Sequence, residues 1–220
     1  MVELYNDDCR NVLKRLRPEN VDVIITDFPY ANGTPYDCYV DTEENLKRLI
    51  RDVWPLFERL RPKVIAFTCG AGNIWLFPKP DWIVGWMNPA GVHRGMFGFN
   101  CFYPILVYGD APVPWDDEEL NTDVLVQYQS GKKRHKYHPS SKPVKFWSKV
   151  VKKFCPWDGA TVLDPMMGTG TTGVCCVKLK KKFIGIELSD VYFKLAQLRI
   201  DAALKGLPDD IETHATLELK

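Results

Sequence analysis

The 220-residue sequence contains no long hydrophobic run, and this absence excludes a membrane-spanning helix from the expected structure. No apolar stretch approaches the roughly 18 residues that such a helix needs, and the N-terminus lacks the pattern of a signal peptide. Internal repeats are absent as well. Hydrophobic residues make up 45% of the chain and charged residues 26%, which is ordinary for one soluble domain. We therefore expect a single cytoplasmic domain over residues 1–220 with no membrane partner.

Paired cysteines and an excess of charge are also missing. The seven cysteines show no C-x-x-C spacing, which favours reduced intracellular thiols over a disulfide framework. His135 and His138 lie among lysines with no cysteine at ligand spacing, so we expect no metal site. The net charge of +1 does not by itself indicate a nucleic-acid partner.

The most informative stretch is residues 162–172, with the sequence V-L-D-P-M-M-G-T-G-T-T. An apolar run ends in Asp164, Pro165 stops the strand, and two glycines allow a sharp turn into a helix whose first turn Thr171 or Thr172 can cap. A strand, a Gly-rich turn and a helix N-terminus form the usual cradle of a nucleotide cofactor, because the glycines let backbone amides approach a ligand.

Two further acids lie at predicted strand ends. A second apolar run ends in Glu187, where a carboxylate can accept both hydroxyl groups of a ribose. The β-branched run of residues 21–26 has the composition of a buried parallel strand and leads into D-F-P-Y at residues 27–30. Asp27 is thereby expected at the carboxyl edge of the sheet, where open α/β sheets bind their ligands.

Together the two motifs resemble those of DNA methyltransferases that modify exocyclic amines. D-P-M-M-G-T-G-T-T is similar to the D-P-F-x-G-S-G-T-T cofactor motif of that family, and D-F-P-Y is similar to its D-P-P-Y catalytic motif. H-P-S-S-K-P at residues 138–143 resembles the family's H-P-x-x-K-P segment. The catalytic motif comes before the cofactor motif, which is the permuted order of the β-class enzymes. The resemblance covers most of the chain.

The predicted fold is α/β: a doubly wound, mostly parallel sheet of seven strands, of the Rossmann-like S-adenosylmethionine-dependent methyltransferase type and circularly permuted. We expect a catalytic half over residues 1–109, a short target-recognition loop over 110–137 and a cofactor-binding half over 138–220. Strands are predicted at residues 3–6, 21–26, 63–69, 81–87, 102–108, 162–164 and 183–186. Helices are predicted at residues 11–16, from 42 with a kink or break at Pro55, and at 73–77, 143–153, 173–180 and 190–204. Residues 88–98 are predicted to be a loop.

The resemblance implies methyl transfer to the exocyclic amine of a base flipped out of the duplex. Such an amine is a poor nucleophile because its lone pair is delocalised into the ring. Asp27 and the carbonyl of Phe28 are expected to accept its two N–H groups and free the lone pair. Pro29 keeps the loop extended, and Tyr30 stacks on the base. Phe28 replaces a usual proline; either only its carbonyl matters, or its ring packs against the base or closes the pocket.

The resemblance further implies S-adenosylmethionine as the cofactor. Asp164 is expected near its amino group and Glu187 on its ribose. Asp8, after the first strand, is expected beside the adenine or, equally, as a helix N-cap. The full set of expected cofactor residues is Asp8, Asp27, Lys142, Asp164, Pro165, Met166, Gly168, Gly170, Thr171, Thr172, Glu187 and Leu188.

Contacts to DNA are expected mainly from basic side chains. Residues 131–153 carry nine lysines or arginines and no acid. A charge run is usually a solvated face, but this one adjoins the expected site and contains aromatic residues, so we favour phosphate contacts. The expected nucleic-acid contacts are Tyr30, Arg94, Lys132, Lys133, Arg134 and Lys136. Because the recognition loop is too short for a separate domain, we expect double-stranded DNA to be bound by a homodimer.

The favoured target is N6 of adenine, because an Asp-initiated motif is commoner for adenine in this class and a Ser-initiated one for cytosine. The alternative within the class is N4 of cytosine. The alternative outside it is a catalytically inactive subunit that binds DNA or cofactor. The resemblance implies a prokaryotic or phage setting of the restriction–modification kind.

Overall fold

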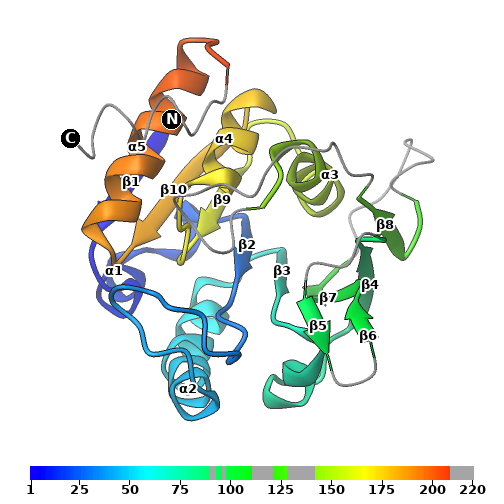
Figure 1. Cartoon of the computed structure of the whole chain (residues 1–220). Coiled ribbons are helices and arrows are strands. Elements are labelled where there is room, and N and C mark those ends of the chain that lie inside the picture. The colour runs from blue at the N-terminus through cyan, green and yellow to red at the C-terminus, as the bar shows by residue number, and fades with distance from the viewer. Residues whose placement is uncertain (90–92, 96–97, 111–120, 128–141, 209–220) are drawn as a thin grey trace.

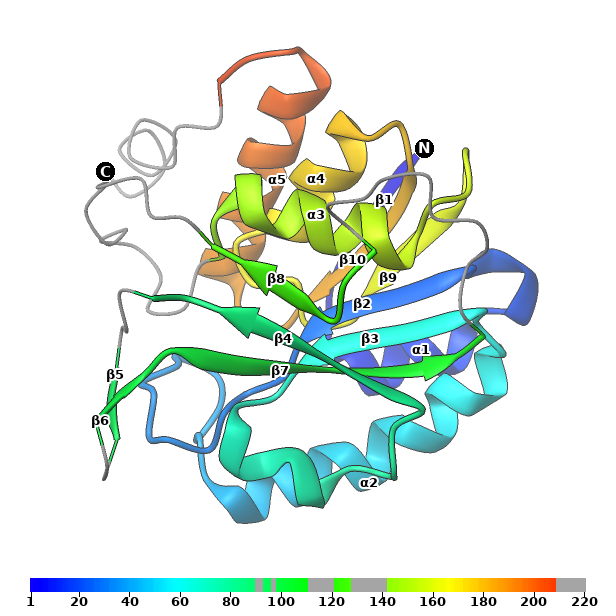
Figure 2. The ribbon, with the colours of Figure 1, turned by 90° about the vertical axis from the view of Figure 1, so that its right-hand side faces the viewer.

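The computed structural model has one central β-sheet between two layers of helices (Figure 1). It describes residues 1–89, 93–95, 98–110, 121–127 and 142–208. The helices are α1 (Cys9–Arg15), α2 (Glu43–Leu60), α3 (Val144–Phe154), α4 (Thr171–Lys178) and α5 (Asp190–Leu204), with 3-10 turns η1 (Pro18–Asn20) and η2 (Ala71–Leu76). Helices α3, α4 and α5 cover one face of the sheet, and α1 and α2 cover the other (Figure 2).

The main sheet has eight strands in the order β1-β10-β9-β2-β3-β7-β4-β8. They are β1 (Val2–Asn6), β2 (Val23–Asp27), β3 (Val64–Thr68), β4 (Trp82–Met87), β7 (Phe102–Gly109), β8 (Val124–Val126), β9 (Thr161–Asp164) and β10 (Lys182–Glu187). Among the described strands of this sheet, only the pairs that β7 forms with β3 and β4 are antiparallel. The predicted doubly wound, mostly parallel fold is thus confirmed, and β9 and β10 lie between β1 and β2 in the sheet.

Alternating side chains of the buried strands divide the core into two clusters. In β2, Val23 and Ile25 belong to the cluster under α3, α4 and α5, whereas Ile24 belongs to the cluster over α1 and α2. This division follows from the two-residue period of a strand. Helix α2 begins after Thr42, whose hydroxyl accepts the amide N–H of Asn45. The helix continues through Pro55, which lies on its exposed side.

The carboxyl ends of the parallel strands bring three predicted acids to one edge of the sheet. Asp27, Asp164 and Glu187 are the last residues of β2, β9 and β10. Asp27 lies opposite Thr68 at the end of β3, and Glu187 lies opposite Asn6 at the end of β1. Because these strands are adjacent and parallel, the functional side chains share that edge.

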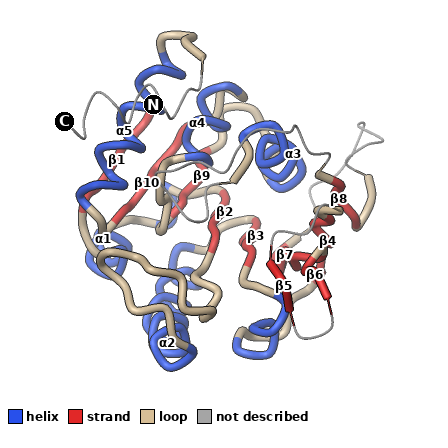
Figure 3. Tube along the Cα trace, viewed as in Figure 1, coloured by secondary structure: helices blue, strands red, loops and turns tan. Residues whose placement is uncertain are grey.

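Some elements differ from the prediction. The sheet has an eighth strand, β8, whose three residues are too few to show a strand pattern. Part of the predicted 88–98 loop instead forms the hairpin of β5 (His93–Gly95) and β6 (Gly98–Asn100), which Figure 3 shows as a separate pair of strands. Helix α4 begins at Thr171 with Gly170 as its N-cap, so neither predicted threonine caps it. In the part of the chain that is described, no helix is long and apolar enough to cross a membrane.

Candidate active site

A cavity of about 380 Å³ opens at the carboxyl edge of the sheet. The loops that follow β1, β2, β9 and β10 form its walls, together with the first turns of α2. Twelve of the residues predicted from the sequence line it: Asp8, Asp27, Pro29, Lys142, Asp164, Pro165, Met166, Gly168, Thr171, Thr172, Glu187 and Leu188. A further wall comes from residues 36–40, for which the sequence predicts no role.

Asp27 has two polar partners at the bottom of this cavity. The hydroxyl of Thr68 donates to one carboxylate oxygen, and the ammonium of Lys142 donates to the other. The Lys142 side chain is 9% exposed, so this ion pair is largely shielded from water. The same ammonium lies 5.2 Å from the centroid of the Tyr30 ring and 5.7 Å from that of Trp86. Lys142, predicted as a cofactor residue, thus lines the cavity and also contacts Asp27, the acid predicted to be catalytic.

Tyr30 lies beside the cavity as part of an aromatic cluster. Its ring centroid is 6.4 Å from that of Tyr103, which lies 4.7 Å from Trp86, and Trp86 stacks on Phe146 at 4.8 Å. Burial raises the pKa of the Tyr30 hydroxyl well above its usual value, and the negative charge of Asp27 adds to this effect.

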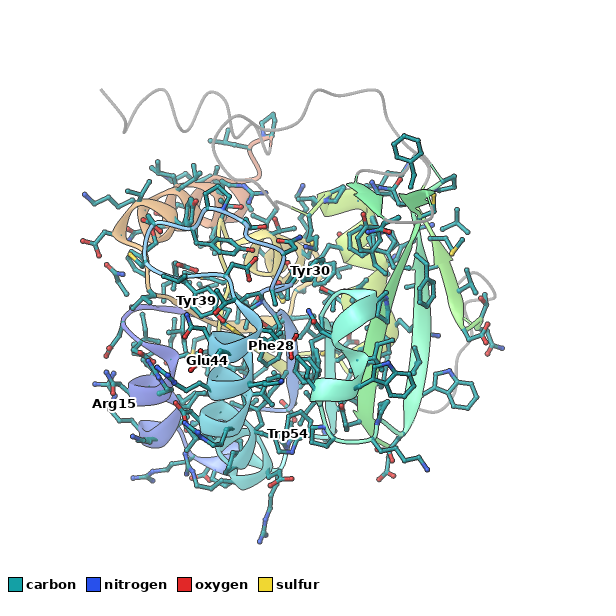
Figure 4. All side chains as sticks on the ribbon, turned by 60° about the horizontal axis from the view of Figure 1, so that its bottom comes forward. Arg15, Phe28, Tyr30, Tyr39, Glu44 and Trp54 are labelled. Atoms are coloured by element: carbon teal, nitrogen blue, oxygen red, sulfur yellow. The ribbon has the colours of Figure 1, made fainter. Side chains whose placement is uncertain are left out.

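The Phe28 ring points away from the cavity. It is 1% exposed and packs edge-on against Phe57, Phe67 and Phe77 at centroid distances of 6.4, 4.8 and 5.0 Å. Figure 4 shows Phe28 beside α2, with Tyr30 farther from that helix. The Phe28 N–H donates to the carbonyl of Thr68 at 3.0 Å. The ring therefore does not close the pocket, and both the ring and the N–H are used by the fold.

Glu187 connects the Gly-rich turn to the start of α5. One carboxylate oxygen accepts the N–H of Gly168 at 2.8 Å, and the other accepts the N–H of Ser189 at 2.9 Å. Burial raises the pKa of Glu187 to about 7, although the two amides oppose this shift. Nearby negative charge on Asp164 and Asp37 favours the protonated form as well.

Asp164 is buried beneath the cavity and bonded within the protein. Its carboxylate accepts the hydroxyls of Thr26 at 2.7 Å and Thr172 at 2.5 Å, and the N–H of Met166 at 3.2 Å. The indole N–H of Trp147 donates to the Thr172 hydroxyl at 2.9 Å. Burial raises the pKa of Asp164 to about 6. This acid therefore holds β2, β9 and the start of α4 together.

Gly170 lies outside the cavity wall, against α5. Its φ of +77° is in the left-handed region, and an added Cβ would lie 2.9 Å from the Cβ of Ala196. From the same helix, Arg199 is 1% exposed and donates to the carbonyl of Thr169 at 2.5 Å and the hydroxyl of Thr171 at 3.2 Å. Arg199 is not among the residues predicted from the sequence, because arginine is mostly an exposed residue, although its spacing from Leu195 and Ala196 places it on the buried face of α5.

Asp8 has the predicted position of a helix N-cap, and its place beside the adenine stays a prediction. It is the N-cap of α1, where its carboxylate accepts the Arg10 N–H at 2.8 Å, and it also lines the cavity. Hydrogen bonding to the Arg10 side chain lowers the pKa of Asp8. Across the cavity, Asp37 accepts the Ser189 hydroxyl at 2.6 Å, so the loop of residues 31–41 is attached to the start of α5.

Comparison with known proteins places the chain in a family. The model of the DNA methylase family matches residues 38–198, which is most of the chain. The chain belongs to this N6/N4 DNA methylase family. The methylase is therefore a DNA methyltransferase whose target is N6 of adenine or N4 of cytosine.

Individual relatives agree with this assignment. The methylase is 25% identical over 262 residues to the type II methyltransferase M.ScaI of Streptomyces caespitosus, an alignment that covers 94% of this chain and 83% of the relative. It superposes on the M1.HpyAVI–SAM complex with a TM-score of 0.67 and 22% identity, covering 90% of this chain and 98% of that one. The PvuII DNA methyltransferase (cytosine-N4-specific) gives a TM-score of 0.72 and 13% identity, covering 98% and 90%. At these identities the superpositions support the fold alone.

Some predicted residues fall outside the description of the methylase. Lys132, Lys133, Arg134, Lys136 and the first four residues of the H-P-S-S-K-P segment lie outside the described residues. Arg94 is described only by its backbone, which pairs with Phe99 in the β5–β6 hairpin. Among the described residues, no group of three His, Cys, Asp or Glu side chains could hold a metal ion.

Proposed function

We propose that the methylase transfers the methyl group of S-adenosylmethionine to N6 of an adenine flipped out of double-stranded DNA. The observation that carries this proposal is the position of Asp27. Its carboxylate lines the same cavity as Asp164 and Glu187, so an acceptor for an amine and the elements of a cofactor site share one space. The choice of adenine rests on the Asp-initiated motif.

The cavity fits this cofactor by its size and chemistry. A volume of about 380 Å³ lies within the range of small-molecule sites. Glu187 lines the wall and uses each oxygen for one backbone amide, which leaves further acceptor capacity for the hydroxyls of a ribose. Leu49, Met166 and Leu188 supply apolar surface for a purine ring. When bound, S-adenosylmethionine supplies an electrophilic methyl group on a positively charged sulfur.

The residues of the D-F-P-Y turn have separate tasks in this proposal. Asp27 accepts one N–H of the target amine, and the carbonyl of Phe28 accepts the other, so the nitrogen lone pair is released from the ring. Tyr30 stacks on the flipped base. Its aromatic neighbour Tyr103 keeps the Tyr30 ring in position for this contact. Lys142 holds the Asp27 carboxylate in place by a charge-assisted hydrogen bond. Asp27 then receives the proton that the methylated amine must lose.

The proposal has two alternatives, which differ in target base and in activity. Methylation of N4 of cytosine uses the same pair of acceptors on a smaller base. The other alternative is an inactive binding subunit, which rests on the departure of Phe28 from the family's D-P-P-Y motif. The core packing of the Phe28 ring gives that substitution a structural reason, so it does not favour loss of activity.

The organisation of the chain follows from the same proposal. Residues 1–109 form the catalytic half, residues 138–220 the cofactor half, and residues 110–137 the target-recognition segment between them. So short a recognition segment supports a homodimer on duplex DNA, which light scattering of the free and DNA-bound methylase would test. Cytoplasmic DNA of a bacterium or phage is the proposed setting.

Identification of the methylated nucleoside tests the proposed function. Unmethylated bacterial DNA would be incubated with the methylase and S-adenosylmethionine carrying a deuterated methyl group, digested to nucleosides and analysed by mass. The expected product is labelled N6-methyldeoxyadenosine. Labelled N4-methyldeoxycytidine alone would assign the enzyme to cytosine. Absence of label from both, with the cofactor bound in calorimetry, would support the inactive subunit.

A further inference from the structure

Asn73 contacts the catalytic turn from η2, the 3-10 turn that follows β3. Its side-chain Nδ2 donates to the carbonyl of Tyr30 at 2.7 Å and to the carbonyl of Cys69 at 2.9 Å. A carboxamide nitrogen carries two hydrogens, so both bonds form at the same time. The Asn73 backbone N–H also donates to the carbonyl of Gly70 at 3.1 Å, which fixes the base of the side chain. One side chain thus joins the end of D-F-P-Y to the end of β3.

The other end of the D-F-P-Y turn is attached to the same strand. The Phe28 N–H donates to the Thr68 carbonyl at 3.0 Å, and the Thr68 hydroxyl donates to the carboxylate of Asp27. Gly70, with a φ of +74°, lies so close to Tyr30 that an added Cβ would be 3.3 Å from the Cγ of that ring. The end of β3 and the residues just after it therefore contact the turn along its length, from Asp27 to Tyr30.

We propose that Asn73 is a positioning residue of the methylase, which fixes the carbonyl of Phe28 and the ring of Tyr30 relative to Asp27. This inference rests on the proposed function. The Phe28 carbonyl and Pro29 lie between the two attachment points, Phe28 N–H and Tyr30 C=O. With Asn73 in place, the second acceptor for the target amine stays at a fixed spacing from the first. Without it, the Tyr30 carbonyl loses this donor and the peptide units on either side of Pro29 can rotate.

The expected effect lies in the transfer step, because Asn73 is not part of the cavity wall that would hold the cofactor. A displacement of about 1 Å in such a site can slow a reaction about 100-fold. Asn73→Ala removes both donors. Asn73→Asp keeps the shape but places a carboxylate oxygen against two carbonyl oxygens. Asn20→Ala is a matched control, since Asn20 also serves a 3-10 turn with its carboxamide, accepting the Arg17 N–H at 3.0 Å in η1.

Steady-state kinetics and calorimetry separate positioning from general damage. In Asn73→Ala and Asn73→Asp we expect kcat to fall about 30-fold or more, while KM for DNA and Kd for S-adenosylmethionine change less than about threefold. Asn20→Ala should keep all three values. A kcat within about threefold of the wild type in both Asn73 variants overturns the proposal. A parallel loss of kcat, cofactor affinity and melting temperature also overturns it, because Asn73 would then only stabilise the fold.

Amide hydrogen exchange tests the contact without using activity. The amides of Ala31, Asn32 and Thr34 donate to the carboxylate of Asp41, so their exchange reports on the segment that follows Tyr30. They should exchange faster in Asn73→Ala, whereas the amides of α2 stay protected. Unchanged exchange would refute the positioning of the turn by Asn73. Faster exchange together with an inactive wild type would instead refute the proposed function and leave the structural contact in place.

Discussion

The ammonium of Lys142 contacts the carboxylate of Asp27, although the two residues are 115 positions apart in the chain. Lys142 comes just before Pro143, the N-cap of α3. Helix α3 packs against the face of the sheet to which Val23 and Ile25 of β2 point. Removing one partner of a largely buried ion pair leaves the other charge poorly compensated. Lys142 therefore holds in place the acid that we propose to accept the target amine.

Replacing Lys142 by methionine should reduce methyl transfer far more than cofactor binding. We expect single-turnover rates to fall about 10- to 100-fold, because Asp27 loses the charge-assisted bond that holds it. The Kd for S-adenosylmethionine should stay within about threefold of the wild type. Lys145→Met, on the exposed side of α3, is the matched control. A large loss of cofactor affinity in Lys142→Met would return this residue to the cofactor site predicted from the sequence.

Asp27 and Asp164 should differ in what their removal affects. Asp27→Ala should abolish methyl transfer and leave cofactor affinity nearly unchanged. Asp164→Ala leaves the buried hydroxyls of Thr26 and Thr172 without their acceptor, at a cost of about 1–3 kcal/mol in stability. Because those bonds shape the Gly-rich turn, Asp164→Ala should also lower the affinity for the cofactor. Calorimetry and thermal melts of both variants decide this; equal loss of affinity in the two would make Asp27 a structural residue.

The pKa of Glu187 predicts a pH dependence of cofactor binding. Burial raises this pKa to about 7, and only the ionised carboxylate has its full acceptor capacity for ribose hydroxyls. Affinity for S-adenosylmethionine should therefore increase by up to about tenfold between pH 6 and pH 8. Calorimetry at several pH values on the wild type and Glu187→Gln checks this. A Glu187→Gln variant that keeps the wild-type profile would assign the titration to Asp164 instead.

The stability of the cofactor-free methylase should change with pH in the opposite direction to cofactor affinity, because of the same Glu187 carboxyl. The folded pKa of about 7 is above the ordinary value of 4.5, so the folded state binds the proton more tightly than the unfolded state does. The contribution of Glu187 to stability is therefore complete below pH 4.5 and is lost as the pH rises through 7. Its ionised form thus lowers the melting temperature in the same pH range in which it improves cofactor binding.

The sequence predicted the acids of the site because their positions depend on local pattern. An apolar run that ends in an acid reports both a buried parallel strand and its exposed edge, and Asp27, Asp164 and Glu187 all satisfy this rule. Contacts between distant segments have no such local signal. The partner of Lys142 and the contact of Asn73 with Tyr30 appear only when α3 and η2 are packed onto the sheet.

The N-terminus of α4 shows why a sound local rule can give the wrong result. Threonine is a good N-cap, and the sequence offers two at the right place. In the structure the hydroxyl of Thr172 donates to the buried Asp164, eight residues earlier, and accepts from Trp147. The Thr172 hydroxyl satisfies a buried carboxylate and does not cap the helix, and Gly170 takes the N-cap position with a left-handed backbone.

The basic stretch at residues 132–136 is predicted to contact phosphates. It lies outside the described residues, so the prediction rests on the sequence. DNA affinity should fall steeply with salt, and each lost contact should reduce the log–log slope by about one unit. A variant with alanine at Lys132, Lys133, Arg134 and Lys136 would be compared with one that has alanine at the exposed Lys178 and Lys182. An unchanged slope in the fourfold variant would make this stretch a solvated surface.

Phe28 should prove important for folding and not for the transfer step. Phe28→Leu keeps the N–H and most of the apolar volume, so transfer per folded molecule should stay within about threefold. Phe28→Ala leaves a cavity among Phe57, Phe67 and Phe77 and should cost about 3–5 kcal/mol in stability.

Phe28→Pro should be the most destabilising of the three variants, although proline is the usual residue in the related motif. It loses the ring and also the hydrogen bond from the Phe28 N–H to the carbonyl of Thr68, a further cost of about 1 kcal/mol. Denaturant titrations give the stabilities, and single-turnover rates below each transition give the activities. A stable Phe28→Leu enzyme that is about 30-fold slower or worse would mean that the ring itself takes part in the reaction.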